Sequence, residues 1–410
     1  MPVRLTGPEK PGDVLRNLLD VPRYTTASTL GAGFVAALLG TTGPALLVYQ
    51  AASGAGYPEA VISSWFFAIF VGGGLLSLLL TLLYREPICG AYPIAGSALL
   101  VTVLGDYSLS EAVGAFLVSG VLVTLLGLTG LFDALMERMP NEVLMGALAG
   151  ILIPFGIEVF ALLPSQPLLM GSMVAAYLVG VRFVRAVPAA LLALVAGFVV
   201  AWASGRFEAG EVDFALSGPV LVAPSFDWGA VVSIAVPLTL LAVATQNAPG
   251  VGILRANGFG PPTNAVTIFS GIGSILTAPL VGNGVNIAAP MTAVCAGPES
   301  HPDVEGRYVA TVTQGVLFIA FGLAGATVIS LIGALPAALI AGVAGLTLLP
   351  VILQSLRLSV GGQRHTLAAG VALLVGASGL SILGINSTFW ALVVGVALAK
   401  LLGKDEGKGP

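Results

Sequence analysis

Neutral hydrogen-bonding side chains and glycines gather at two breaks in otherwise apolar sequence, at residues 87–97 and 279–289. The candidate binding residues in these breaks are Tyr92, Pro93, Gly96, Ser97, Asn283, Gly284 and Asn286. Amide and hydroxyl groups donate hydrogen bonds without carrying charge, and glycine lets a ligand approach the backbone closely. This combination predicts a binding site for a small anion rather than a catalytic centre.

Three further polar residues could reach the same site from neighbouring segments. They are Gln246 and Asn247, at the end of one apolar run, and Thr41, at the end of another. For each amide, the alternative role is an interhelical hydrogen bond that only holds the bundle together. For Ser97 and Thr42, the alternative is a hydrogen bond back to the residue's own helix.

Residues suited to acid–base, nucleophilic or metal chemistry are scarce within the apolar segments. Glu86, just before the first break, is the best candidate for carrying a coupling proton, and the alternative is a solvated carboxylate at the membrane surface. Cys89 and Cys295 fall in or beside the breaks, and we interpret them as small buried residues. Without a nucleophile–base pair or a metal-ligand cluster, we expect no enzyme activity, no metal and no cofactor.

Composition indicates a membrane protein with little chain outside the bilayer. Hydrophobic residues make up 57% of the 410 residues and charged residues 9%, against about 25% charged in soluble domains. The mean hydropathy is +1.00. Since a helical span needs roughly 20 apolar residues, the length allows about 14 spans. We predict spans near 27–49, 59–84, 87–104, 111–132, 142–161, 168–184, 187–204, 229–247, 262–278, 279–297, 308–333, 334–355, 366–382 and 386–402.

Basic residues fix the predicted orientation of these spans. With both termini in the cytoplasm, 15 of the 16 Lys and Arg residues fall on the cytoplasmic side, as the positive-inside rule requires, and only Arg206 falls outside. The cytoplasmic set is Arg4, Lys10, Arg16, Arg23, Arg85, Arg138, Arg182, Arg185, Arg255, Arg307, Arg357, Arg364, Lys400, Lys404 and Lys408. The first 26 residues lack the pattern of a cleaved signal peptide.

The two halves of the chain repeat the same order of landmarks. In each half a span ends in Thr and Pro, a Gly-Pro turn follows, and then a helix leads into a broken segment. Because seven spans per half is an odd number, the second half is inverted. The predicted parts are a cytoplasmic segment 1–26, a first repeat 27–204, an extracytoplasmic linker 205–228, a second repeat 229–402 and a cytoplasmic tail 403–410.

The inversion predicts that the breaks meet inside the membrane. Each broken segment would run extended and then start a half-helix, near Pro93 in the first and Val285 in the second. The two half-helix N-termini would then face one another. Each carries about half a positive charge and free N–H donors, so the pair forms an anion site without Lys or Arg.

Two stretches resemble the benzoate:proton symporter (BenE-type) family. One is Thr-Gln-Asn-Ala-Pro-Gly at 245–250 with Leu-Arg-Ala-Asn-Gly at 254–258, and the other runs from Asn-Ile-Ala-Ala at 286–289 through Gly-Pro-Glu-Ser-His-Pro-Asp at 297–303 to Arg307-Tyr308. The resemblance implies the seven-plus-seven inverted-repeat fold shared with nucleobase and sulfate/anion transporters. It implies core spans within 27–132 and 229–333, and gate spans within 142–204 and 334–402, which often dimerise.

Two departures from this family pattern fall at the predicted site. Asn283 stands where the family usually has His, which removes a proton carrier and a donor for a carboxylate. Residues 92–96 read Tyr-Pro-Ile-Ala-Gly, where the family often has Trp-Ser-Thr-Pro-Gly. Both changes bear on substrate and coupling ion rather than on the scaffold.

The sequence therefore predicts a secondary transporter of a small organic anion, with benzoate or a related aromatic carboxylate favoured. We expect proton coupling with Na+ as the alternative ion, and alternating access between core and gate domains. An inorganic anion or nucleobase carrier on the same fold is the alternative function. The expected partners are the lipid bilayer of a bacterial inner membrane and a second copy at the gate spans, and no nucleic acid.

Overall fold

The computed structural model describes residues 7–130, 140–184, 187–205, 215–361, 365–382 and 385–402. Most of these residues are helical. In the first half the elements are α1 Val14–Tyr24, α2 Ala27–Thr41, α3 Gly43–Gly54, α4 Glu59–Tyr84, β1 Gly90–Ala91, α5 Ile94–Val103, η1 Leu104–Asp106, α6 Leu109–Thr129, α8 Asn141–Ala161, α9 Pro167–Phe183 and α10 Ala189–Ala203.

The second half begins with a long helix that contains two π-helical turns. Its elements are α11 Trp228–Ala230, η2 Val231–Ala235, α12 Val236–Ala242, η3 Val243–Asn247, α13 Ala248–Ala256, α14 Thr263–Thr277, η4 Ala278–Leu280, β2 Asn286–Ile287, α15 Ala289–Ala296, η5 Val304–Gly306, α16 Tyr308–Leu323, α17 Gly325–Gly333, α18 Ala337–Val360, α19 Thr366–Ala377 and α20 Ser387–Leu402.

Eight helical stretches among the described residues are long and apolar enough to cross a membrane. They are Ala27–Gly54, Glu59–Tyr84, Leu109–Thr129, Asn141–Ala161, Trp228–Ala256, Thr263–Leu280, Val304–Leu323 and Ala337–Val360. Five shorter apolar helices accompany them. The prediction of a mostly helical membrane protein is confirmed.

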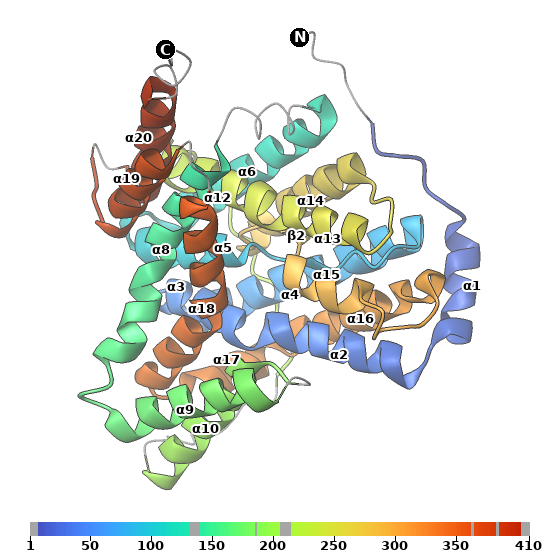
Figure 1. The fold of residues 1–410 in the computed structure, drawn as a ribbon, viewed down its shortest axis with the longest axis horizontal. Coiled ribbons are helices and arrows are strands. Elements are labelled where there is room, and N and C mark those ends of the chain that lie inside the picture. The colour runs from blue at the N-terminus through green and yellow to red at the C-terminus, as the bar shows by residue number, and fades with distance from the viewer. Residues whose placement is uncertain are drawn as a thin grey trace.

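The halves of the chain interleave rather than fold separately. Helix α4 packs on α16, α6 on α14, and α8 on both α18 and α19. Figure 1 shows α8, α9, α18, α19 and α20 on one side of the molecule, and α2, α4, α14, α15 and α16 on the other. One large buried apolar cluster runs through both sides.

Several element boundaries differ from those predicted. The first predicted span is broken at Thr42, after which a new helix, α3, begins at Gly43 with Pro44 in its first turn. The span predicted to end at 247 continues to Ala256, because its π-helical turns carry the helix past Gln246 and Asn247. The span predicted over 308–333 is two helices, α16 and α17.

A short antiparallel pair of strands joins the two breaks. Gly90 pairs with Ile287 and Ala91 with Asn286. Because residues 286–287 are extended, helix α15 begins at Ala289, later than the expected start near Val285. Helix α5 begins at Ile94 with Pro93 as its N-cap, close to the predicted start.

Two serines hold the non-helical backbone next to these strands. The Ser77 hydroxyl on α4 accepts a hydrogen bond from the Gly90 N–H at 2.7 Å, and the Ser274 hydroxyl on α14 accepts one from the Val285 N–H at 2.9 Å. Backbone polar groups in an apolar interior need such partners. The two halves solve this problem in the same way.

Replacing Ser274 with Ala should destabilise the protein by about 1–3 kcal/mol, because the buried Val285 N–H then loses its acceptor. Ser270, one turn earlier on the same helix, is the matched control, since its buried hydroxyl has no partner. Thermal unfolding in detergent should show a lower melting temperature for Ser274→Ala than for the native protein. Ser270→Ala should not lower the melting temperature. Equal melting temperatures would contradict the role given to Ser274.

Parts of the predicted topology lie outside the described residues. These are the basic residues Arg4, Arg138, Arg185, Arg206, Arg364, Lys404 and Lys408, together with residues 206–214 of the predicted linker.

Candidate functional site

A cavity of about 430 Å³ lies where the first turns of α5 and α15 approach α8 and α18. Its lining includes Ile94 and Ala95 from α5, Ala289 and Pro290 from α15, and a long apolar wall. The wall residues are Met145, Leu148 and Leu152 from α8, and Leu348, Val351 and Leu358 from α18. No charged side chain lines this cavity in the part of the chain that the structure describes.

Both helices present uncapped N-termini to this cavity. Neither the Pro93 cap of α5 nor the Ala288 cap of α15 makes a side-chain hydrogen bond to its helix. The first backbone N–H groups of a helix have no partner within the helix, and they carry its positive dipole end. Two such ends on one cavity favour an anionic group there.

Gln246 is the predicted site residue that lines the cavity itself. It lies in the π-helical turn η3, and its Oε1 is buried with no hydrogen-bond partner. Single π-helical turns inside α-helices are common at functional sites. Thr245 lines the cavity beside it, but its hydroxyl already donates to the Leu241 carbonyl at 2.6 Å.

Asn283 and Ser97 are brought together behind the cavity. The Asn283 amide donates to the Ser97 hydroxyl at 3.1 Å, and its oxygen accepts from the Trp65 indole N–H at 3.1 Å. The Ser97 hydroxyl donates to the Pro93 carbonyl at 3.1 Å. This is the hydrogen bond to its own helix that the sequence indicated as the alternative role of Ser97. This network joins α4, α5 and the second break, so Asn283 and Ser97 hold these three segments together.

Tyr92 and Thr41 use their polar groups elsewhere. The buried Tyr92 hydroxyl donates to the Gly40 carbonyl at 2.8 Å, and its ring packs edge-on against Phe70 with centroids 5.3 Å apart. The Thr41 hydroxyl donates to the Ala37 carbonyl at 2.9 Å. Neither residue lines the cavity.

The remaining amides, Asn247 and Asn286, lie at or beside the second strand, and the two predicted glycines lie one in each half of the chain. Asn247 accepts a hydrogen bond from the Ile287 N–H at 3.0 Å, while its Nδ2 has no partner. Both amide atoms of the buried Asn286 are also without partners. Gly284 has a φ of +120°, and a Cβ at Gly96 would collide with Leu238. Unpaired buried amides call for a ligand or water partner.

Glu86 lies away from this cavity, beside a second hollow between the end of α4 and the loop after α13. Its Oε1 accepts from the Gly260 N–H at 3.0 Å, and its Oε2 is buried without a partner. Burial raises the pKa of this carboxyl to about 7, against the lowering effect of the Gly260 hydrogen bond. The charged neighbours lining the hollow are Asp13, Arg16, Arg85 and Glu305.

The structure adds cavity residues that the sequence did not single out. Asn141, at the start of α8, and Gln354 and Ser355, on α18, give the wall its polar groups. Nothing near them in the sequence resembles a motif, and helix packing alone brings them to the site. By contrast, Cys89 and Cys295 are buried and do not line the cavity, and the Cys89 thiol is hydrogen-bonded to the Thr311 hydroxyl at 3.4 Å.

The loop at 297–303 supports the end of α15. The Ser300 hydroxyl donates to the Cys295 carbonyl at 2.7 Å, and the Arg307 guanidinium donates to the Ala296 carbonyl at 2.8 Å. These contacts satisfy carbonyl groups that a helix end leaves unpaired. Ser300 in the loop and Arg307 beyond it therefore cap the C-terminus of α15.

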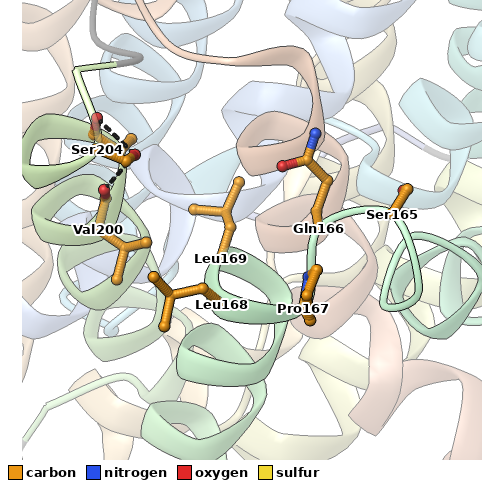
Figure 2. A pocket seen from close by; sticks show the side chains of 8 residues that line it. Ser165, Gln166, Pro167, Leu168, Leu169, Val200 and Ser204 are labelled. Atoms are coloured by element: carbon orange, nitrogen blue, oxygen red, sulfur yellow. Dashed lines mark hydrogen bonds between the residues drawn. The ribbon is translucent and has the colours of Figure 1, made fainter.

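A smaller hollow of about 170 Å³ lies between α9 and α10 (Figure 2). Its lining is mostly apolar, and the Ser204 hydroxyl is bonded to the Val200 carbonyl at 2.6 Å. It offers no charged group and none of the predicted site residues.

An apolar helical bundle with a mainly apolar cavity beside two helix N-termini is typical of a membrane transporter. The family model described as "Benzoate membrane transport protein" (BenE) matches residues 23–401. The chain belongs to this family, and the resemblance drawn from sequence is confirmed.

Two curated relatives cover nearly the whole chain. "Inner membrane protein YdcO" of Escherichia coli (strain K12) is 39% identical over 367 residues, covering 90% of this chain and 94% of its own length. "Benzoate membrane transport protein" of Acinetobacter baylyi is 30% identical over 365 residues, covering 89% of this chain and 92% of its own length. The chain is an integral membrane protein of a transporter family.

Solved structures share the fold at low sequence identity. SLC26A9 aligns with a TM-score of 0.65 at 12% identity, covering 99% of this chain and 73% of its own. The transmembrane domain of the cyanobacterial bicarbonate transporter BicA aligns with a TM-score of 0.55 at 15% identity, covering 98% of this chain and 100% of its own.

Proposed function

We propose that the protein is a secondary transporter of a small organic anion, with benzoate or a related aromatic carboxylate as substrate. The observation that carries this proposal is the cavity between the first turns of α5 and α15. Its volume of about 430 Å³ falls within the usual range for small-molecule sites, roughly 300–1,000 Å³. A curated relative named as a benzoate transport protein supports the choice of substrate.

In this proposal the carboxylate is held by the first N–H groups of α5, at Ile94 and Ala95, and by the Ala289 N–H of α15, where Pro290 has no N–H to offer. The Gln246 amide donates a further hydrogen bond from the side. The aromatic ring packs on the apolar wall formed by α8 and α18, including Leu148, Leu152 and Leu348. Helix N-termini offer N–H donors in fixed positions without a full positive charge. Binding the anion therefore does not require a Lys or Arg side chain to lose its hydration.

We further propose that the predicted fourteen spans and two inverted repeats describe this fold. The eight long apolar helices, the five shorter ones and α15 match the predicted spans in order. Helices α5 and α15 are then the half-helices of the two repeats. The paired use of Ser77 and Ser274 supports the repeat, because both hold the backbone of a broken segment from the helix before it.

Alternating access would come from the core spans, 27–132 and 229–333, moving against the gate spans, 142–204 and 334–402. The cavity is lined from both groups, so such a motion changes its exposure. Asn141 and Gln354 are exposed at its mouth, near helix ends that the basic residues assign to the cytoplasm. The conformation described here is then inward-facing, in a bacterial inner membrane.

The first test is thermal stabilisation of the purified protein by benzoate, aliphatic carboxylates, sulfate, bicarbonate and uracil. A ligand that binds only the folded state raises the melting temperature by mass action. We expect benzoate to give the largest shift, and vesicles containing the protein to accumulate labelled benzoate. A shift with bicarbonate or sulfate alone would favour the inorganic-anion alternative, and the apolar wall would then have no role in recognition.

Glu86 is proposed as the coupling-proton carrier. Its raised pKa of about 7 means that it binds a proton between pH 4.5 and 7 in the folded protein, where a free carboxyl would be ionised. Below pH 4.5 the Glu86 carboxyl is protonated in both the folded and the unfolded protein. As the pH rises from about 4.5 through 7, the unfolded protein loses this proton first, so the free energy of unfolding falls. Glu86→Gln should remove this pH dependence.

The measurement is the uptake rate and melting temperature of Glu86→Gln and native protein from pH 5 to pH 8. The native uptake rate should fall as the pH rises through about 7, while the variant should show a flat profile over that range. Glu305→Gln is the matched control, since Glu305 is an exposed carboxyl lining the same hollow. A Glu86→Gln profile identical to the native one would exclude Glu86 as the carrier.

A further inference from the structure

Helix α1 carries an apolar face that no other part of the described chain covers. Leu15, Leu18 and Leu19 are 66%, 51% and 69% exposed. With about 3.6 residues per turn, these leucines share one side of the helix with Val14. Large exposed apolar patches mark contacts with a partner or a membrane.

The opposite side of α1 is fixed to the body of the protein. Buried Asn17 donates to the Leu82 carbonyl at 2.8 Å, and its own carbonyl accepts from the Tyr308 hydroxyl at 2.7 Å. Asp20 forms an ion pair with Arg85 at 2.8 Å. These contacts fix the rotation of α1, so the direction of its leucine face is set by the fold.

A third side of the helix is basic. Arg16 and Arg23 are both exposed and lie beside the leucine face on the helix surface. Asp20, the acidic residue between them, is already paired with Arg85. Lys10 is exposed just before the helix.

Helix α1 lies against the ends of two membrane spans. It is attached at Leu82, near the end of α4, and at Tyr308, the first residue of α16. Figure 1 shows α1 running crosswise to α2 and α16 at the edge of the molecule. A helix placed across the ends of membrane spans lies at the level of the lipid headgroups.

We infer that α1 is an interfacial membrane helix. Its leucine face enters the acyl-chain boundary of the adjacent leaflet, and Arg16 and Arg23 contact anionic phospholipid headgroups. Short helices with an apolar face flanked by basic residues bind membranes in this way. The bilayer is the occupant that the structure supports, because the face is continuous with the ends of membrane spans and its flank is positively charged.

The test uses fluorescent labels on single introduced cysteines in the full-length protein, reconstituted in vesicles. Leu18→Cys reports the leucine face and Arg23→Cys the basic side, while Cys89 and Cys295 are buried and serve as the unlabelled background. Brominated acyl chains should quench the label at position 18, and aqueous iodide should quench the label at position 23. Leu15→Cys provides a second reporter on the leucine face.

Iodide quenching at position 18 equal to that at position 23 would overturn the inference. Protection of position 18 from both quenchers would also overturn it, because a second copy or another protein segment would then cover the face.

The headgroup contact has a separate test. Lipid quenching at position 18 should rise when phosphatidylglycerol is added to phosphatidylcholine vesicles, since basic residues near an anionic surface are attracted to it. The rise should disappear in Arg16→Gln/Arg23→Gln. A rise that persists in this double variant would show that the arginines do not contact the headgroups.

Discussion

Replacing Gln246 with Leu should weaken benzoate binding by about tenfold to a hundredfold, the usual value of one hydrogen bond to a charged group. The side chain keeps nearly the same size, so the cavity keeps its shape. Because the Oε1 of Gln246 has no partner in the protein, the change costs no hydrogen bond to that atom. The melting temperature without ligand should therefore stay the same or rise.

Gln246→Glu sharpens this prediction. It keeps the shape and places a carboxylate beside the bound one, so binding should be lost rather than weakened. Both variants are measured by the melting-temperature shift with benzoate and by uptake into vesicles.

Gln50 provides the matched control for Gln246. Its Oε1 is also buried without a partner, but it belongs to α3 and does not line the cavity. Gln50→Leu should leave the benzoate shift intact. If Gln246→Leu also left it intact, the placement of the carboxylate at this cavity would be wrong.

Gly284→Ala should destabilise the protein by about 1–3 kcal/mol, the cost of a residue held in a backbone conformation that suits only glycine. The φ of Gly284 is +120°, and an added Cβ would lie 3.1 Å from the Ser274 Oγ. That oxygen is the acceptor for the Val285 N–H, so the added methyl group also disturbs the hydrogen bond that holds the second break.

The matched control is Gly252→Ala in α13. Gly252 is exposed, and a Cβ there would meet nothing within 4 Å. Because Ala is favoured over Gly inside a helix, this variant should be neutral or more stable. Thermal unfolding of both variants tests the prediction, and equal melting temperatures would show that the backbone at Gly284 is not restrained.

The sequence by itself determined the class of fold, the family and the location of the two breaks. These properties depend on local features. Long apolar runs select membrane helices because the backbone must satisfy its own hydrogen bonds in lipid. Gly and Pro at residues 87–97 and 279–289 favour non-helical backbone there, although Gly72, Gly73 and Gly74 remain inside helix α4. The pattern at residues 87–97 and 279–289 therefore indicated where extended backbone would occur, and the structure has β1 and β2 there.

The tertiary structure decided which polar side chains are free to bind. Asn283 and Gln246 are both amides near the breaks, yet Asn283 is bonded to Trp65 and Ser97 while Gln246 faces a cavity. Tyr92 likewise gives its hydroxyl to Gly40. The partner of a buried polar group is set by which helices pack against it, and the packing of α4, α8 and α18 around the breaks is not encoded in the local sequence of either break.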